Sequence, residues 1–124
     1  MTTAHRIAAS YWAAIERRDW TAFATLLADD VVYDLPQTRE RVRGRDAYLR
    51  FNVEYPGDYQ VSVERVIGEQ RHAATWTRFT VDGATQEAQT FLELDDDDLI
   101  VKVTDFWPEP YDPPSGREHL VERY

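Results

Sequence analysis

The dipeptide Asp82-Gly83 constrains the fold of this 124-residue chain more than any other feature. It separates two runs of alternating apolar and polar residues, 72–81 and 84–94, and an Asp-Gly pair in that position is typical of a two-residue β-hairpin turn. The turn also fixes the strand register, which predicts the pairs Val81–Ala84, Arg78–Glu87, Trp76–Gln89 and Ala74–Phe91. A long antiparallel hairpin is therefore expected in the second half of the chain.

The first half of the chain has helical spacing instead. Thr2 or Thr3 can cap a first helix that runs to about Arg18, and Asp19 can cap a second, shorter helix. Asp46 begins a third helix that ends at Pro56, because the residue before a proline avoids helical geometry. Further strands are predicted at 31–35, 59–67 and about 99–107, and a charged loop at 36–45.

This order of elements, α-α-β-α-β-β-β-β, predicts an α+β fold. We expect a single domain over residues 1–124, in which residues 108–124 form a proline-rich tail. Ser115 and Glu118 have the spacing of a capping box, which suggests a short helix at the end of this tail.

Composition excludes several classes of function. The chain has no cysteine, so disulfides and zinc–thiolate sites are excluded, and its net charge of −9 disfavours binding to nucleic acid. His5, His72 and His119 fall in different elements, and we expect neither a bound metal nor a cofactor. No apolar run is long enough to span a membrane and no signal peptide is recognised, which suggests a cytoplasmic protein.

The segment "YWAAIERRDWTAFATLLADDVVYDLP", Gly44-Arg45 before the third helix and "VTDFW" on the last strand resemble the nuclear-transport-factor-2-like superfamily. The resemblance covers residues 3 to 107 and is closest to the SnoaL-like and ketosteroid-isomerase-like branch. It implies a cone-shaped, curved antiparallel sheet wrapped by the N-terminal helices around a ligand cavity. It also implies a range of activities, among them isomerases, polyketide cyclases and non-catalytic binding modules.

The isomerase residues of that branch carry over only in part. The resemblance matches Tyr11 to the isomerase tyrosine, but it places Leu35 at the position of the catalytic base and Gln89 at that of the aspartic acid. We therefore do not predict a true ketosteroid isomerase. Side chains alternate along a strand, so Tyr33 and Leu35 share one face and Asp34 should point away from the cavity.

A polar cluster is predicted on the face that the resemblance assigns to Gln89. The hairpin register then also turns Trp76, Arg78, Glu87 and Phe91 inward. At the acidic turn Asp95–Asp98, pairing of Leu94 with Asp98 would add Asp105 to this face, and pairing with Leu99 would turn it away. The last strand of the family favours the first register, with Val103, Asp105 and Trp107 inward.

From this we predict catalytic roles for Asp105, Glu87 and Arg78, because two carboxylates near one guanidinium can supply an acid and a base. The predicted ligand-binding residues are Tyr11, Tyr33, Leu35, Trp76, Gln89, Phe91, Val103 and Trp107. The alternatives are that Arg78 and Glu87 form an ion pair in solvent, that Asp105 is exposed, and that the aromatic residues belong only to the core.

Three functions remain open on the sequence. The first is a cofactor-independent lyase, isomerase or cyclase that moves a proton on a small hydrophobic oxygenated molecule. The second is a non-catalytic module that binds such a molecule. The third is a protein-interaction module, or a homodimer, that uses an open sheet face formed by Thr75, Thr77, Phe79, Ala88, Thr90 and Leu92.

Overall fold

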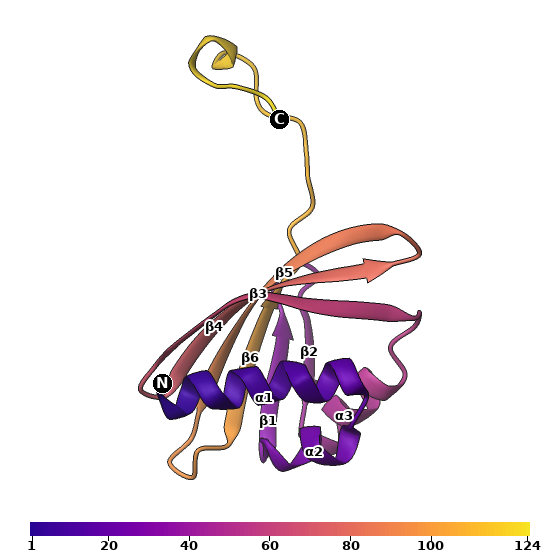
Figure 1. Ribbon diagram of the computed structural model, residues 1–124, viewed down its shortest axis with the longest axis vertical. Helices are drawn as coiled ribbons and strands as arrows, with labels where there is room; N and C mark the ends of the chain where they lie inside the picture. Colours follow the sequence, from indigo (N-terminus) through magenta and orange to yellow (C-terminus); the bar gives the residue numbers. More distant parts are fainter.

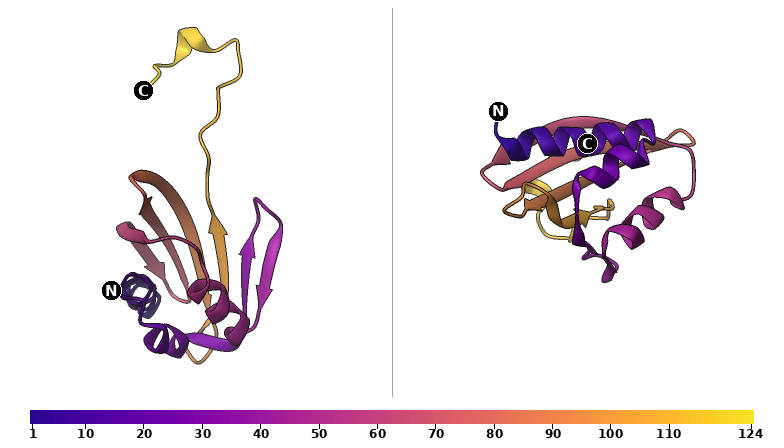
Figure 2. Two further views of the ribbon diagram at one scale, coloured as in Figure 1. Left: turned by 90° about the vertical axis from the view of Figure 1, so that its right-hand side faces the viewer. Right: turned by 90° about the horizontal axis from the view of Figure 1, so that it is seen from below.

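A computed structural model describes all residues from Met1 to Tyr124, and it contains one six-stranded sheet with three helices on one face (Figures 1 and 2). The helices are α1 (Thr3–Arg17), α2 (Trp20–Thr25) and α3 (Arg45–Val53). The strands are β1 (Leu27–Leu35), β2 (Glu40–Arg43), β3 (Tyr59–Glu69), β4 (His72–Val81), β5 (Ala84–Leu94) and β6 (Ile100–Phe106). Their order across the sheet is β2-β1-β6-β5-β4-β3, and only β1 and β6 run parallel. The predicted α+β class is confirmed. None of the helices is long and apolar enough to cross a membrane.

Helix α1 lies across the sheet, and its buried side chains form one side of the core. Thr2 caps it by accepting a hydrogen bond from the backbone N–H of His5, and its apolar stripe of Ala8, Tyr11, Trp12 and Ile15 is buried. Trp12 donates a 2.9 Å hydrogen bond to Thr75 Oγ1 on β4. This bond identifies the sheet face that carries Thr75 as the inner face.

The close approach of α1 to the sheet requires a glycine at position 68. A Cβ atom built on Gly68 of β3 would lie 2.5 Å from the backbone nitrogen of His5. Since backbone cannot move aside as a flexible side chain can, any larger residue would push the helix off the strand.

Two features at the start of the sheet differ from the prediction. The first strand, predicted at 31–35, already begins at Leu27 as the nine-residue β1, and the predicted charged loop contains the strand β2. The strand β2 pairs with β1 through Val42–Tyr33 and Arg41–Asp34. This strand has no alternation of apolar and polar residues that would have predicted it, because three of its four side chains are exposed at the sheet edge.

The hairpin register is confirmed at every predicted pair from Val81–Ala84 to Ala74–Phe91. Asp82 and Gly83 have φ angles of 51° and 80°, the left-handed conformations that a type I′ turn requires.

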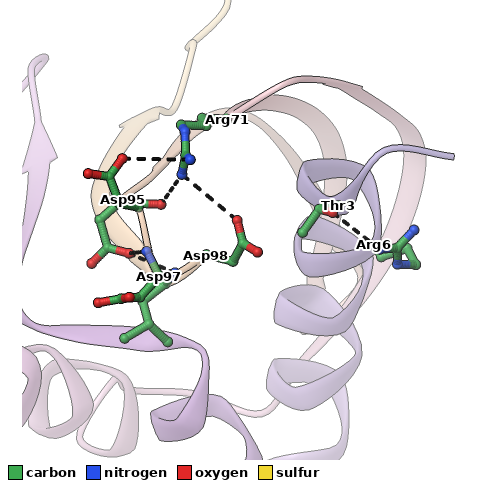
Figure 3. Close-up of polar contacts among 8 residues, drawn as sticks. Thr3, Arg6, Arg71, Asp95, Asp97 and Asp98 are labelled. Atoms are coloured by element: carbon green, nitrogen blue, oxygen red, sulfur yellow. Dashed lines mark hydrogen bonds and ion pairs between the residues drawn. The ribbon is translucent and has the colours of Figure 1, made fainter.

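Both registers considered for the following turn are wrong. Leu94 pairs with Ile100, and an irregularity next to Glu93 shifts the pairing so that Thr90 lies opposite Asp105. The turn is held by Asp95, whose Oδ1 accepts the backbone N–H groups of Asp97 and Leu99, and by Arg71, whose guanidinium bonds the carbonyl oxygen of Asp95 (Figure 3). Arg71 also lies 3.9 Å from the Asp98 carboxylate. Arg71, from the β3–β4 turn, therefore contacts three of the four aspartates, and the fourth, Asp97, bonds to Asp95.

The assignment of the two sheet faces is reversed on β4 and β5. The residues expected inward, Trp76, Arg78, Glu87, Gln89 and Phe91, lie on the face that no helix covers. The residues expected on the open face are the inner ones, and all of them are buried: Thr75, Thr77, Phe79, Ala88, Thr90 and Leu92. The hairpin register determines which residues share a face, but it does not determine which face the helices cover.

After β6 the chain leaves the body of the protein. Residues 108–114 form neither helix nor strand and lead away from the sheet, and Ser115 and Gly116 form a turn (Figures 1 and 2). A single 3-10 turn, η1 (Glu118–Leu120), lies near the C-terminus. In this turn the Glu118 carboxylate accepts the backbone N–H of Gly116.

Candidate functional site

Asp105 is the one buried carboxylate of the chain, and three side chains donate hydrogen bonds to it. Tyr33 Oη donates to Oδ2 at 2.6 Å, Trp107 Nε1 donates to the same oxygen at 3.0 Å, and Thr90 Oγ1 donates to Oδ1 at 2.6 Å. These donors come from β1, from β5 and from the residue that follows β6. The site is therefore assembled where the parallel strand pair meets the hairpin.

Two opposing effects act on the Asp105 carboxyl group. Burial raises the pKa of Asp105 above its ordinary value, because the charged form loses hydration. The hydrogen bonds from Thr90, Tyr33 and Trp107 stabilise the charged form and offset part of that rise. A carboxyl group in such surroundings can exchange a proton at a higher pH than an exposed aspartate.

A pair of tyrosine hydroxyls lies beside this carboxylate. Tyr11 of α1 and Tyr48 of α3 are both buried, and their oxygens are 2.5 Å apart. Burial raises the pKa of both hydroxyl groups well above the ordinary tyrosine value, so both remain protonated. One proton is used within the pair, which leaves the other available to an oxygen of a ligand.

Aromatic stacking connects the tyrosine pair to the carboxylate. The ring of Tyr33 stacks on that of Tyr48 at a centroid distance of 4.6 Å, and Phe51 contacts both rings. This packing holds the two polar groups in fixed relative positions. Rigid support of this kind is what a preorganised site requires.

Two adjoining pockets meet at Asp105. The outer pocket has a volume of about 480 Å³ and the inner one about 30 Å³, and Tyr33, Phe51, Tyr55, Asp105 and Trp107 line both. The outer volume is in the range of small-molecule sites. The inner pocket is lined mainly by aromatic side chains and is the one that Tyr11 and Tyr48 reach.

The charges around these pockets have a single sign. Apart from Asp105, the ionisable carboxylates of the outer pocket are Glu40 and Glu109, and no arginine, lysine or histidine lines either pocket. A negatively charged ligand would therefore meet repulsion and find no cation to pair with.

The structure brings together part of the predicted site. Tyr33, Leu35, Asp105 and Trp107 line the outer pocket, and Tyr11 lines the inner one. Val103 faces inward but is wholly buried beneath the pockets and lines neither.

The predicted partners of Asp105 lie on the other side of the sheet. Arg78 is 3.7 Å from both Glu87 and Glu64, and Glu87 accepts a 2.8 Å hydrogen bond from Trp76 Nε1. Arg78 and Glu87 therefore form the solvent-exposed cross-strand ion pair that the sequence analysis gave as the alternative to a catalytic role. Gln89 and Phe91 are on the same outer face, so the expectation that these five side chains line the cavity is wrong.

Asp34 also points away from the cavity, as predicted. Its carboxylate accepts a two-pronged hydrogen bond from Arg41, with distances of 2.6 and 3.0 Å, and lies 2.9 Å from Lys102 Nζ. The hydrogen bonds from Arg41 hold the pKa of Asp34 well below its usual range. Asp34 therefore joins β2, β1 and β6 on the outer face as a group that is charged at neutral pH.

Two polar residues of the site were missed in the sequence. Thr90 was placed on the outer face with its hairpin neighbours, and Tyr48 was not among the predicted site residues. A signal for Thr90 existed, because the face it shares with Thr75, Ala88 and Leu92 carries no charged residue along β4 and β5. A face without charge is the one expected to be buried.

Comparison with known proteins supports the fold and gives the family. The model of the SnoaL-like domain matches residues 8–103. A crystal structure from Kribbella flavida, described as a "putative ketosteroid isomerase", is 48% identical, covers 98% of this chain and 90% of its own, and superposes with a TM-score of 0.94. A search of the curated proteins found no match.

More distant structures share the fold alone. An epoxide hydrolase from Mycobacterium tuberculosis, described as LEH-like, is 18% identical, with a TM-score of 0.71 over 86% of this chain and 83% of its own. The M. tuberculosis protein RV0760c, solved in complex with estradiol-17β-hemisuccinate, is 18% identical, with a TM-score of 0.73 over 87% of this chain and 95% of its own. On the match over residues 8–103, this chain belongs to the SnoaL-like domain family, with the fold of nuclear transport factor 2.

Proposed function

We propose that this protein is a cofactor-independent enzyme that moves a proton on a small, hydrophobic, oxygenated molecule. The observation that carries the proposal is the position of Asp105, a buried carboxylate with three hydrogen-bond donors at the junction of two aromatic pockets. The SnoaL-like family membership agrees with an isomerase or cyclase type of reaction.

In this proposal Asp105 is the base. Its Oδ2 already accepts two hydrogen bonds, whereas Oδ1 accepts one, from Thr90, and keeps a lone pair for a substrate proton. The proton leaves a carbon next to a carbonyl group and binds Oδ1, and the C–H electron pair moves into the new C=C bond. The carbonyl oxygen becomes an enolate. Return of the same proton to another carbon completes an isomerisation.

The Tyr11–Tyr48 pair supports the enolate in the same scheme. The hydroxyl that accepts the bond within the pair still has its own proton, which it donates to the substrate oxygen as negative charge develops there. Burial excludes water from both hydroxyls and strengthens this interaction. The carboxylates at the outer pocket favour an uncharged substrate over an anionic one.

Hydrogen–deuterium exchange provides a test that does not depend on the exact substrate. A panel of neutral cyclic and bicyclic ketones is incubated with the protein in D₂O, and loss of the C–H signals next to the carbonyl is followed by proton NMR. We expect exchange above the buffer rate for at least one ketone. Asp105→Asn should abolish it, and Asp34→Asn, on the neighbouring strand but the outer face, should leave it intact. Exchange that survives in Asp105→Asn would overturn the assignment of the base.

The second candidate function is binding without catalysis. It is favoured by the fact that both oxygens of Asp105 already accept hydrogen bonds, so the carboxylate has a structural explanation. Saturable binding of a ketone from the panel, with no exchange in the wild-type protein, would favour this candidate over the enzyme.

We also propose that the protein forms a homodimer through the outer face of the sheet. The face expected from the sequence is the buried one, and the uncovered face carries Trp76, Phe91 and Phe106 with exposed fractions of 38%, 47% and 36%. Phe91 and Phe106 lie edge to face at 6.0 Å and form an aromatic patch on this surface. Sedimentation equilibrium over a range of concentrations tests the proposal, and a monomer at every concentration would overturn it.

A further inference from the structure

Residues 110–124, here called the C-terminal arm, make no hydrogen bond to the rest of the chain. Large apolar side chains of the arm are exposed to solvent: Tyr111 is 89% exposed and Leu120 is 73% exposed. Figure 1 and the left-hand view of Figure 2 show the arm standing away from the sheet. Within this chain, nothing holds the arm where it lies.

The match to the Kribbella flavida crystal structure indicates that its corresponding segment lies in the same place. The match to it covers 98% of this chain at a TM-score of 0.94. The score averages over the chain, so a relative with its last 15 residues elsewhere, about one eighth of the length, could not reach that value. The arm therefore has a reproducible position relative to the body.

A fixed arm without contacts is thermodynamically unfavourable. Ordering the backbone costs on the order of 1–2 kcal/mol per residue, and burial of apolar surface is the main source of free energy that offsets it. Because the arm, where it lies, packs its apolar side chains against no surface of its own chain, a second molecule must supply that surface.

We propose that the C-terminal arm binds a second copy of this chain and packs against the uncovered sheet face of that copy, around Trp76, Phe91 and Phe106. Each copy then holds the arm of the other, which gives the self-complementary contact of a two-fold dimer. The inference deepens the dimer proposed above and is independent of the proton-transfer chemistry.

The chemistry of the two surfaces fits this arrangement. The arm begins with Pro110, Pro113 and Pro114, and a proline-rich extended segment is already ordered in the form that aromatic surfaces bind. At about 3.1 Å per residue, an extended segment over residues 108–114, which precedes the turn at Ser115 and Gly116, spans roughly 22 Å. That length carries the apolar residues Leu120, Val121 and Tyr124 beyond the body of their own chain and onto a neighbour.

The absence of native cysteine allows a direct test by cross-linking. Two full-length variants with different affinity tags are mixed, one with Val121→Cys on the arm and one with Gln89→Cys on the uncovered face, and oxidised. We expect a disulfide between the two differently tagged chains. The control pair is Val121→Cys with Ser10→Cys, which is exposed on the opposite, helical side of the body and should not cross-link.

The double variant Val121→Cys/Gln89→Cys distinguishes the alternative. If the arm folds onto its own sheet face, oxidation of dilute protein gives a disulfide within one chain and no linked dimer, which would overturn the proposal. Equal cross-linking to Gln89→Cys and Ser10→Cys would also overturn it, since contact would then be unspecific.

A second measurement avoids engineered cysteines. Replacing Tyr111, Leu120, Val121 and Tyr124 together by serine keeps the chain length and the pocket residue Glu109. We expect the dimer dissociation constant from sedimentation to rise at least about tenfold, since apolar anchors dominate interface energetics. An unchanged dissociation constant would overturn the proposal that the arm binds the second copy, and the dimer through the sheet faces would still stand. The ketone exchange assay reports separately on the active site.

Discussion

Tyr33 and Asp105 are 72 positions apart in the sequence, and the tyrosine hydroxyl donates a 2.6 Å hydrogen bond to the aspartate carboxylate inside the cavity. The bond joins β1 to β6, the parallel pair in the sheet. It stabilises the charged form of a carboxylate that burial otherwise disfavours. The protonation of Asp105 therefore depends on a residue from the other end of the chain.

Removal of this bond should move the pH dependence of the site. Tyr33→Phe keeps the ring stacked on Tyr48 and removes one donor to the charged carboxylate, so the pKa of Asp105 should rise further. The base form then appears only at higher pH, and the acidic limb of the exchange-rate profile should shift toward higher pH. Rates measured across the profile check this, with Tyr55→Phe, a pocket residue with no bond to Asp105, as the control. Coinciding Tyr33→Phe and wild-type profiles would contradict it.

Loss of the tyrosine hydroxyl pair should lower the rate without moving that profile. Tyr48→Phe removes the 2.5 Å partner of Tyr11 but keeps the packing of the ring. If the pair stabilises an enolate, turnover should fall by about 10²-fold, the usual cost of one such donor, while KM changes little. Steady-state kinetics on the ketone identified by exchange makes the measurement. A rise in KM with unchanged kcat would instead assign the pair to ground-state binding.

The outer-face ion pairs of Asp34 should contribute to stability in a defined pH window. Arg41 and Lys102 depress the pKa of Asp34, so the contribution is fully present above the ordinary aspartate pKa and is lost as the pH falls through the folded-state value. Asp34→Asn should cost about 1–2 kcal/mol at neutral pH, given a two-pronged charged hydrogen bond that is partly open to solvent.

Urea unfolding at several pH values measures this difference. The free energies of unfolding of the wild type and Asp34→Asn should converge toward the acid end of the series. A constant difference at every pH would mean that the effect of the substitution is not electrostatic.

The contact between α1 and Gly68 should not tolerate a methyl group. Gly68→Ala places a Cβ atom against the backbone of His5, and we expect it to lower the free energy of unfolding by roughly 1–3 kcal/mol. Ser62→Ala, at an exposed position of the same strand, is the control and should change stability by less than about 0.5 kcal/mol. Thermal unfolding of the two variants gives the comparison, and an equally stable Gly68→Ala protein would show that the helix can shift at little cost.

The hairpin shows how far sequence reasoning extends in this fold. Asp82-Gly83 gives the register of β4 and β5 from local backbone chemistry alone, and every pair it predicts is found. The face that the helices cover is a tertiary property, and no local rule contains it. Gln89 was placed inward because the family resemblance matched it to the position of the isomerase aspartic acid. An error of one residue in such a match reverses the face, because side chains alternate along a strand.

The position of Asp105 illustrates the second limit. It faces the cavity as predicted, yet its partners are Tyr33, Thr90 and Trp107 instead of Arg78 and Glu87. The irregular pairing at Glu93 and Leu94 shifts the register between β5 and β6, next to the acidic turn that Arg71 contacts. A contact between residues so far apart in the sequence leaves no periodic pattern.

The central place of β6 has a consequence for how the protein is made. This strand is the last of the sheet to be synthesised, yet it lies between β1 and β5, and within the sheet the strands of the two halves of the chain are joined only through it. Pairing over such a sequence separation must close a long loop before any contact compensates the entropy, which slows folding. While the chain is still on the ribosome, β1 therefore has no neighbour on the β6 side, and Tyr33 and Thr90 have no carboxylate to bind. The site is completed only after almost the whole chain has emerged, so an incomplete product of translation would lack the site as well as the tail.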